Sequence, residues 1–300
     1  MRRGRERGVG ASMTRNTKPG RQVSAPATSL LQRLLVRARN VVLGRSYVRY
    51  RGYVLPPPEM RSRMCGSEYA SNDFFLDSGS AEARRLITRL TYTRNSRVVE
   101  IGSGLGRLAI GLLREAGPVE YWGFDASKPW IAWCRKHIER RHPSFRFIHL
   151  DVENELYNPH GTAVGNDFRF PLPDGHADIV YMWGVFTNMR LNDARMYVSE
   201  IGRVLRDGGR VFLTAFVETN VPPESINPAG YVDYECTLPL QVVRYEQDGL
   251  FSIFAEHGLA VEQFSHHGGT HCNQSEIYLM KVAGPVSSPR DQPSMTARRN

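Results

Sequence analysis

The chain has 300 residues, a length that suits one large domain or one domain with extensions. With 41% hydrophobic and 10% aromatic residues it can bury a core, and no stretch approaches the roughly 20 uninterrupted apolar residues that cross a bilayer, so wholly disordered and membrane-spanning classes are excluded. The net charge of +9 is uneven, because residues 1–49 hold twelve Arg or Lys and one acid while the remainder holds 27 basic and 29 acidic residues.

The first 26 residues form a basic arm that is rich in Arg, Gly, Ser and Thr and lacks apolar periodicity, which predicts disorder. The arm has no apolar core of a secretory signal, and either Met1 or Met13 could be the true start of the chain. The first aromatic residue of the chain is Tyr47, so no aromatic side chain interleaves with the charges of the arm. A nucleic-acid partner is therefore not expected.

Residues 27–68 are predicted to form a helical extension, beginning with a helix capped by Thr28 or Ser29. One interpretation is a helix that packs on the domain with its arginines in solvent. The other is a basic amphipathic helix that makes peripheral contact with the inner face of an anionic membrane. The pattern fits both interpretations, because the apolar residues fall on one stripe of the helix and the arginines lie largely off it. The apolar residues are Leu30, Leu31, Leu34, Leu35, Ala38, Val41 and Val42, and the arginines are Arg33, Arg37 and Arg39.

From Arg97 onward, short apolar strands alternate with helical patterns, which is typical of a parallel sheet flanked by helices in a doubly wound α/β domain. We place this domain at residues 69–282, followed by a disordered polar tail at 283–300. The predicted strands are 98–101, 119–124, 145–150, 178–183, 210–217, 260–264 and 276–282. The predicted helices are 105–116, 127–141, 193–205 and 250–257.

The spacing of the cysteines and histidines bears on two questions, the redox state of the compartment and the presence of a metal site. The four cysteines are far apart and form no CxxC pair, which fits a reducing, cytoplasmic compartment and argues against a disulfide framework. The nine histidines show no ligand spacing such as HExxH. We therefore expect no metal site.

The stretch VVEIGSGLGRLAI, residues 98–110, joins the first strand of the domain to its first helix through three glycines. In the dinucleotide fingerprint G-x-G-x-x-G the third glycine comes one place later than Gly106, where this chain has Arg107. Glu100 precedes Gly102, and a carboxylate there would repel a pyrophosphate but suits a cofactor with a sulfonium and an ammonium group. The spacing of Gly102, Gly104 and Gly106 therefore favours S-adenosylmethionine.

Acidic residues at the next strand ends agree with this donor. Asp125 ends the second strand of the domain, nineteen residues after Gly106, where a carboxylate can accept both ribose hydroxyls. Two alternatives stay open for the side of the adenine. One is Asp151 at the end of the third strand, and the other is Asp167 together with the adjacent Phe168.

The segment from about Tyr69 to Val282 resembles class I S-adenosylmethionine-dependent methyltransferases of bacteria, of the type 11/12-like group. The matching pieces are VVEIGSGLGRLAIGL, WGFDAS, FRFPLPDGHADIVYMWGVFTNM and EIGRVLRDGGRVFLT. The resemblance implies a Rossmann-like, seven-stranded sheet with helices on both faces and an antiparallel last strand. It also implies that Glu100, Gly102, Gly104, Gly106 and Asp125 bind the donor. The group usually shows histidine at the position of Asn188.

Methyl transfer from a sulfonium is an in-line displacement, so the enzyme mainly holds the acceptor in line and excludes water. A general base is needed only where the acceptor is a hydroxyl that must lose its proton. We expect O-methylation of a small organic, sugar or lipid acceptor, in a pocket that uses the stretch Tyr47–Phe75 and the Pro- and aromatic-rich segment 218–240. The candidates for the base lie on loops at the strand ends: Asn188, Glu218, His266, His267 and His271.

Two other functions remain open at this point. A catalytically silent Rossmann-like binding module would keep the cofactor pocket but transfer nothing. An NAD(P)-dependent oxidoreductase would need the later third glycine and a proton donor such as a Tyr-x-x-x-Lys pair, and the sequence has neither.

Overall fold

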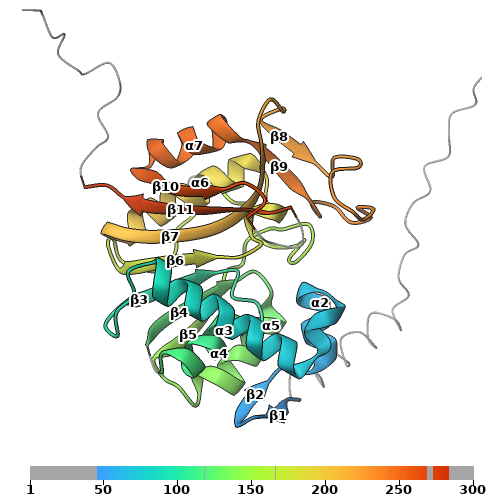
Figure 1. The fold of residues 1–300 in the computed structure, drawn as a ribbon, viewed down its shortest axis with the longest axis vertical. Helices are drawn as coiled ribbons and strands as arrows, with labels where there is room; N and C mark the ends of the chain where they lie inside the picture. Colours follow the sequence, from blue (N-terminus) through green and yellow to red (C-terminus); the bar gives the residue numbers. More distant parts are fainter. Residues whose placement is uncertain (1–45, 118, 166, 269–272, 284–300) are drawn as a thin grey trace, which may run out of the picture. The chain divides into compact units, whose positions relative to one another are not determined.

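A mixed β-sheet with helices on both faces organises the part of the chain that the computed structural model describes, residues 46–283 without 118, 166 and 269–272 (Figure 1). All of these residues belong to one unit of the chain. The predicted arm at 1–26, the helix predicted from Thr28, and residues 284–300 of the predicted tail lie outside the described residues.

Seven strands form the main path of the sheet in the order β10-β11-β7-β6-β3-β4-β5. The five strands from β7 to β5 pair in parallel, whereas β11 runs antiparallel to both of its neighbours. The predicted Rossmann-like sheet with an antiparallel last strand is therefore confirmed. The strands are β3 (Arg97–Ile101), β4 (Glu120–Asp125), β5 (Phe145–His149), β6 (Ala177–Met182), β7 (Leu205–Glu218), β10 (Leu259–Ser265) and β11 (Ser275–Lys281).

Four short strands were not predicted from the sequence. β9 (Val243–Glu246) pairs in parallel with the last residues of β7, and β8 (Glu224–Ile226) pairs antiparallel with β9, so the sheet has nine strands. β1 (Val48–Tyr50) and β2 (Tyr53–Leu55) form a separate hairpin. The residues at the hairpin turn, Arg51 and Gly52, both have positive φ, as a tight two-residue hairpin turn requires.

The predicted helical extension is therefore only partly helical where it is described. After the hairpin come α2 (Pro58–Cys65) and a short 3-10 helix, η1 (Ser67–Ala70). α3 (Asn72–Arg89) follows, and the Ser71 hydroxyl accepts the N–H of Phe74 and caps its first turn.

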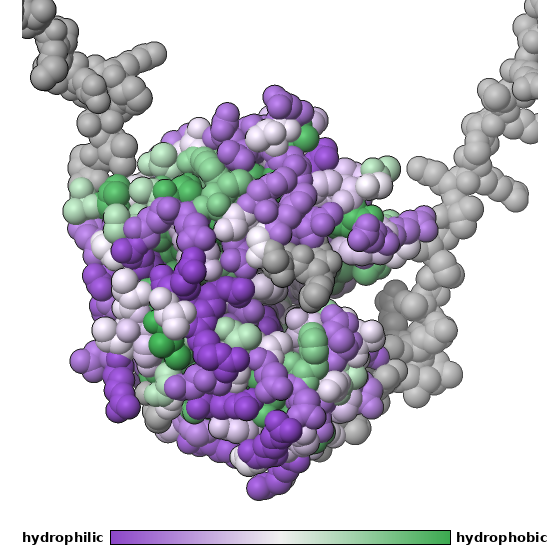
Figure 2. Space-filling view, viewed as in Figure 1, coloured by the Kyte–Doolittle hydropathy of each residue, from purple (hydrophilic) through white to green (hydrophobic). Residues whose placement is uncertain are grey.

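The helices cover the sheet in two layers. Successive strand residues point to opposite faces, so Val98 packs with α3, α4 (Arg107–Glu115) and α5 (Lys128–Cys134), while Val99 packs with α6 (Leu191–Val204) and α7 (Gln247–Glu256). A single π-helical turn, η2 (Arg135–Glu139), continues α5. Figure 2 shows mostly polar residues on one face of the molecule, with apolar residues gathered where α7 and β10 lie.

α3 and α4 cross closely because glycines lie at the crossing. A Cβ atom on Gly111 of α4 would lie 2.0 Å from the carbonyl oxygen of Gly79 in α3.

None of the helices in the described part of the chain is long and apolar enough to span a membrane. The carboxyl ends of β3, β4, β6 and β7 meet at one edge, where open α/β sheets bind their ligands.

Candidate active site

The glycine turn between β3 and α4 has a backbone that only glycine adopts easily. Gly102, Gly104 and Gly106 all have φ between +53° and +78°. The N–H groups of Gly102 and Ser103 donate to the carbonyl of Phe124 in β4, at 2.8 and 2.9 Å. A Cβ atom on Gly104 would also lie 2.5 Å from the sulfur of Met64. The turn is thus fixed against β4 and lies close beneath α2.

Asp125, at the end of β4, is bound to this turn from the other side. Its Oδ2 accepts the N–H of Gly104 and its Oδ1 accepts the N–H of Ser127, both at 2.7 Å. Burial raises the pKa of Asp125 to about 6, although the two backbone hydrogen bonds oppose this shift. Each carboxylate oxygen keeps a second lone pair, so the group can still accept ribose hydroxyls as predicted.

Glu100 lies on β3 beneath the turn and is almost completely buried. The hydroxyl of Tyr121 in β4 donates to its Oε2. Burial raises the pKa of Glu100 to about 8, against the lowering effects of the Tyr121 hydrogen bond and of Arg107. The carboxyl group lines the cavity described below and is suited to an ammonium group.

Arg107, the first residue of α4, supplies a buried positive charge next to Glu100. Burial alone would lower its pKa, but neighbouring groups, Glu82 first among them, raise it, so the guanidinium stays charged. Glu82 also pairs with Arg85 at 2.6 Å and accepts the hydroxyl of Tyr181. An ammonium group bound beside Glu100 would favour loss of its proton, so Glu100 and Arg107 together suit the two charged groups of an amino acid.

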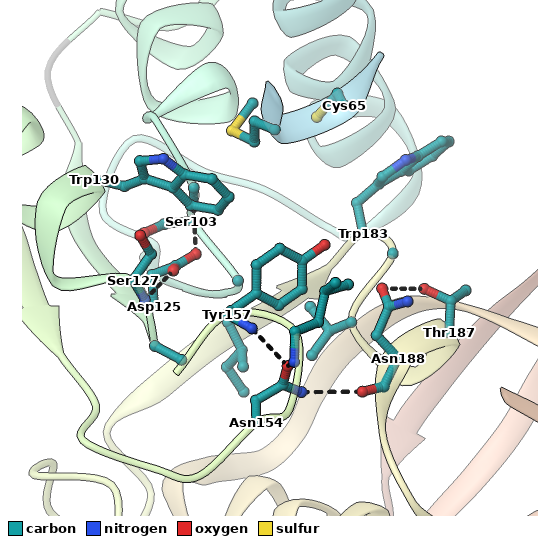
Figure 3. A pocket seen from close by; sticks show the side chains of 18 of the residues that line it. Cys65, Ser103, Asp125, Ser127, Trp130, Asn154, Tyr157, Trp183, Thr187 and Asn188 are labelled. Carbon is teal, nitrogen blue, oxygen red and sulfur yellow. Dashed lines mark hydrogen bonds between the residues drawn. The ribbon is translucent and has the colours of Figure 1, made fainter. Parts of the chain in front are cut away.

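These residues line one cavity of about 950 Å³, near the upper end of the range for pockets that enclose a small ligand (Figure 3). Trp130 lies on the same side as Asp125, and the ring of Tyr157 projects toward the middle of the cavity, with the centroids of the two rings 5.7 Å apart. Trp183 and Asn188 lie on the opposite side. The hydroxyl of Ser103 is buried in the lining and has no hydrogen-bond partner among the described residues. A bound ligand would supply one.

Four predicted cofactor residues do not line this cavity. Gly106 shapes the turn from within the core, where a Cβ atom would lie 2.6 Å from Cδ1 of Ile138. Asp151 is exposed and its Oδ1 accepts the side-chain amide of Asn158 at 3.0 Å. Asp167 is also exposed. Phe168 packs into the core and stacks on Tyr197 with ring centroids 4.8 Å apart. The structure thus does not place Asp151, Asp167 or Phe168 in the cavity lining.

The predicted catalytic residues divide into two groups. Asn188 lies in η3 (Phe186–Asn188) and lines the cavity, but its Nδ2 donates to the carbonyls of Leu240 and Gln241, both at 2.9 Å. Its amide therefore holds the backbone in place and is no base. Glu218, His266 and His267 come together outside the cavity lining, whereas His271 lies outside the described residues.

Several lining residues were missed from the sequence. Four of them stand within or next to motifs quoted above, so their spacing from the glycines could have identified them: Ser103, Arg107, Ser127 and Trp130. Trp183 also stands within a quoted motif. The segments 47–75 and 218–240, expected to form the acceptor pocket, contribute further lining residues: Met60, Met64, Cys65, Tyr69, Tyr234 and Leu238. Tyr157 and Gln241 lie outside these segments and motifs.

Residues 98–209 match the family model described as a methyltransferase domain. The chain carries a class I S-adenosylmethionine-dependent methyltransferase domain. S-adenosylmethionine is the cofactor of this class, so the donor predicted from the glycine turn is confirmed for the methyltransferase domain.

Curated relatives match part of the methyltransferase domain. Demethylmenaquinone methyltransferase of Thermus thermophilus is 28% identical over 133 residues, which are 44% of this chain and 53% of that protein. A chloroplastic protein of Oryza sativa subsp. japonica, named as a probable tocopherol O-methyltransferase, is 32% identical over 81 residues, which are 26% of this chain and 22% of that protein. The chain thus spans about half the length of the first relative and less of the second.

A solved structure shares the fold of the methyltransferase domain. It is a chain of the complex between the Haloferax volcanii Trm112 methyltransferase activator and a methyltransferase, with a TM-score of 0.50 and 16% identity. The match covers 69% of this chain and 91% of that one.

Proposed function

We propose that the protein transfers the methyl group of S-adenosylmethionine to a hydroxyl of a small organic or lipid acceptor. The observation that carries this proposal is the continuity of one cavity from the donor side, at Asp125 and Glu100, to a second side with aromatic residues. Trp183 lies on this second side, and Tyr69 and Tyr234 also belong to the cavity lining. An acceptor with an apolar ring fits such walls.

On the donor side, Asp125 binds the ribose, and Glu100 and Arg107 bind the ammonium and the carboxylate of the methionine part. S-adenosylmethionine supplies a methyl group on a positively charged sulfur, which leaves as the neutral thioether. The cavity walls keep the acceptor oxygen in line with this group and exclude water.

The hydroxyl of the acceptor must lose its proton as the new bond forms. No histidine lines the cavity among the residues that the structure describes. Besides Glu82, Glu100 and Asp125, three carboxyl groups do: Glu68, Glu153 and Asp193. Burial raises the pKa of Asp193 above its ordinary value, which makes this carboxylate a better proton acceptor. The names of the two curated relatives, which refer to a quinone and to tocopherol, support an apolar, ring-bearing acceptor.

The test is transfer of a labelled methyl group from S-adenosylmethionine to a panel of phenols, quinols and lipid alcohols. Asp125→Ala serves as the variant that loses the donor, and calorimetry with S-adenosylmethionine reports binding separately. We expect wild-type protein to bind the donor and label at least one class of acceptor. Donor binding without transfer to any of them would favour the silent binding module, and absence of donor binding would overturn the proposal.

A further inference from the structure

Glu218, His266 and His267 form a cluster of three side chains that the sheet brings together from distant parts of the chain. Glu218 ends β7, and the two histidines follow β10. The Nε2 atom of His266 lies 3.0 Å from Oε2 of Glu218, and that of His267 lies 2.8 Å from Oε1. The ligand atoms of all three lie within 4.8 Å of one another.

An unusual backbone turn aims the two imidazoles at the same carboxylate. Neighbouring residues in a strand point to opposite faces, but here the N–H of Gly268 donates to the carbonyl of Ser265 and closes a four-residue turn around the histidines. His267 has φ +50°, a left-handed conformation that is uncommon for a residue other than glycine. The two rings consequently stack with centroids 3.8 Å apart.

The three groups are chemically suited to a metal ion. The carboxylate of Glu218 accepts the hydroxyl of Tyr231 at 2.9 Å, and both imidazoles lie within hydrogen-bond distance of its two oxygens. A carboxylate only accepts, so each Nε2 now donates a proton to it. In a metal complex the proton of each neutral imidazole would sit on Nδ1 instead. Two imidazoles and one carboxylate form a ligand set of zinc and of other divalent transition metals.

The spacing also fits such an ion. Ligand atoms about 2.0–2.2 Å from a tetrahedral zinc are roughly 3.3 Å apart, so separations of 2.8 and 3.0 Å need to widen only slightly. The side chains of His266 and His267 are 48% and 37% exposed, which leaves room for an entering ion and for water at a fourth position. No metal site was expected from the sequence, because the spacing of these three residues along the chain carries no sign of the cluster.

We propose that Glu218, His266 and His267 bind a divalent transition metal ion of the zinc type. Through Glu218, the ion would hold the segment 219–242 in place beside the cavity. Tyr231 of this segment donates its hydroxyl to Glu218 at 2.9 Å, and its carbonyl accepts the side-chain amide of Asn273, which precedes β11. Tyr234, Leu238 and Gln241 of the same segment line the cavity. This inference does not depend on methyl transfer.

The experiment uses the full-length protein without a histidine tag, treated with a chelator and then titrated with zinc ions by calorimetry. Wild-type protein is expected to bind one zinc ion at this cluster. Glu218→Gln and His267→Ala are each expected to weaken binding by more than the roughly 10- to 100-fold that losing an outer hydrogen-bond partner of a ligand costs. His160→Ala, which changes an exposed histidine outside the cluster, is the matched control.

Metal-free thermal unfolding first shows that each variant is folded, and His266→Ala replaces any variant that is not. Zinc binding that is absent from the wild type, or equal in the wild type and the cluster variants, would overturn the site. Hydrogen exchange then tests the fastening role, because residues 219–242 should exchange more slowly with zinc in the wild type only. Unchanged exchange in these residues would overturn that role and leave the metal site.

Discussion

Asp125 accepts the backbone N–H of Gly104 at 2.7 Å, so the carboxylate that ends β4 holds the glycine turn that follows β3. Its other oxygen holds the N–H of Ser127 at the start of α5. The residue predicted to bind ribose therefore also shapes the two segments that surround the donor. Its loss should affect both the turn and the cofactor.

The first prediction concerns Asp125→Asn. An amide keeps one oxygen, but its NH2 group then faces a backbone N–H, so one buried donor loses its partner at a cost of about 1–3 kcal/mol. We expect the free energy of unfolding to fall by about this amount in urea titrations, and donor affinity to fall at least roughly tenfold in calorimetry. Asp151→Asn, at the exposed end of the next strand, should change neither. Equal donor binding in both variants would contradict the role of Asp125.

The second prediction concerns Glu100 and pH. Its pKa rises from an ordinary 4.5 in the unfolded chain to about 8 in the fold, so the folded state holds the proton more tightly. The stability from this group is fully present below pH 4.5 and is lost as pH rises through about 8. Urea unfolding at several pH values measures this effect. Across this window, the free energy of unfolding of Glu100→Gln should fall less steeply with rising pH than that of the wild type. Parallel declines would show that the carboxyl group does not titrate there.

The sequence predicted the parts of the site that are local in the chain. Gly102, Gly104 and Gly106 are diagnostic because a strand, a left-handed turn and a helix must follow one another within a few residues. Asp125 was found because the carboxyl ends of parallel strands meet at one edge of a sheet. Both inferences depend on the order of elements, which the alternation of apolar strands and helices shows directly.

The parts that depend on tertiary packing could not be predicted. Phe168 follows a loop whose path the sequence does not specify, and its ring stacks on Tyr197 in the core instead of facing the cavity. The cluster of Glu218 with His266 and His267 depends on the register of β7 with β11, where Ala215 pairs with Ser275. Residues 48 and 49 positions apart carry no common sequence pattern.

The third prediction concerns Trp130, which lies beside Asp125 on the donor side of the cavity. Stacking of a base on an aromatic ring contributes about 1–3 kcal/mol, so Trp130→Ala should weaken donor binding by roughly tenfold. Trp130→Phe keeps a ring and should recover most of the affinity. Calorimetry with S-adenosylmethionine measures both. If Trp130→Ala binds the donor as well as Trp130→Phe does, the adenine lies elsewhere.

The fourth prediction concerns the crossing of α3 and α4. In Gly111→Ala the new methyl group would lie 2.0 Å from the carbonyl oxygen of Gly79, so the helices must separate. Overpacking of this kind costs about 1–3 kcal/mol, which outweighs the gain of about 1 kcal/mol in helix propensity. Gly249→Ala in α7 meets only the end of the Glu246 side chain, at 3.3 Å, and should be neutral or stabilising. Thermal unfolding of both variants distinguishes packing from propensity.

The last prediction concerns Asn188, one of the catalytic candidates proposed from the sequence. Its amide donates to the carbonyls of Leu240 and Gln241, and its own backbone carbonyl accepts the side chain of Asn154 at 3.0 Å. In Asn188→Asp the carboxylate would face two carbonyl oxygens with no proton to share. The segment that ends at Gln241 should then detach from η3.

We expect faster hydrogen exchange at residues 238–242 in Asn188→Asp and a free energy of unfolding lower by about 1–3 kcal/mol, with donor affinity unchanged because Asn188 lies on the opposite side of the cavity from Asp125. Asn192→Asp, an exposed substitution in the first turn of α6, is the matched control and should leave the exchange of residues 238–242 as in the wild type. Slow exchange of residues 238–242 in both variants would mean that contacts other than those of Asn188 hold this segment in place.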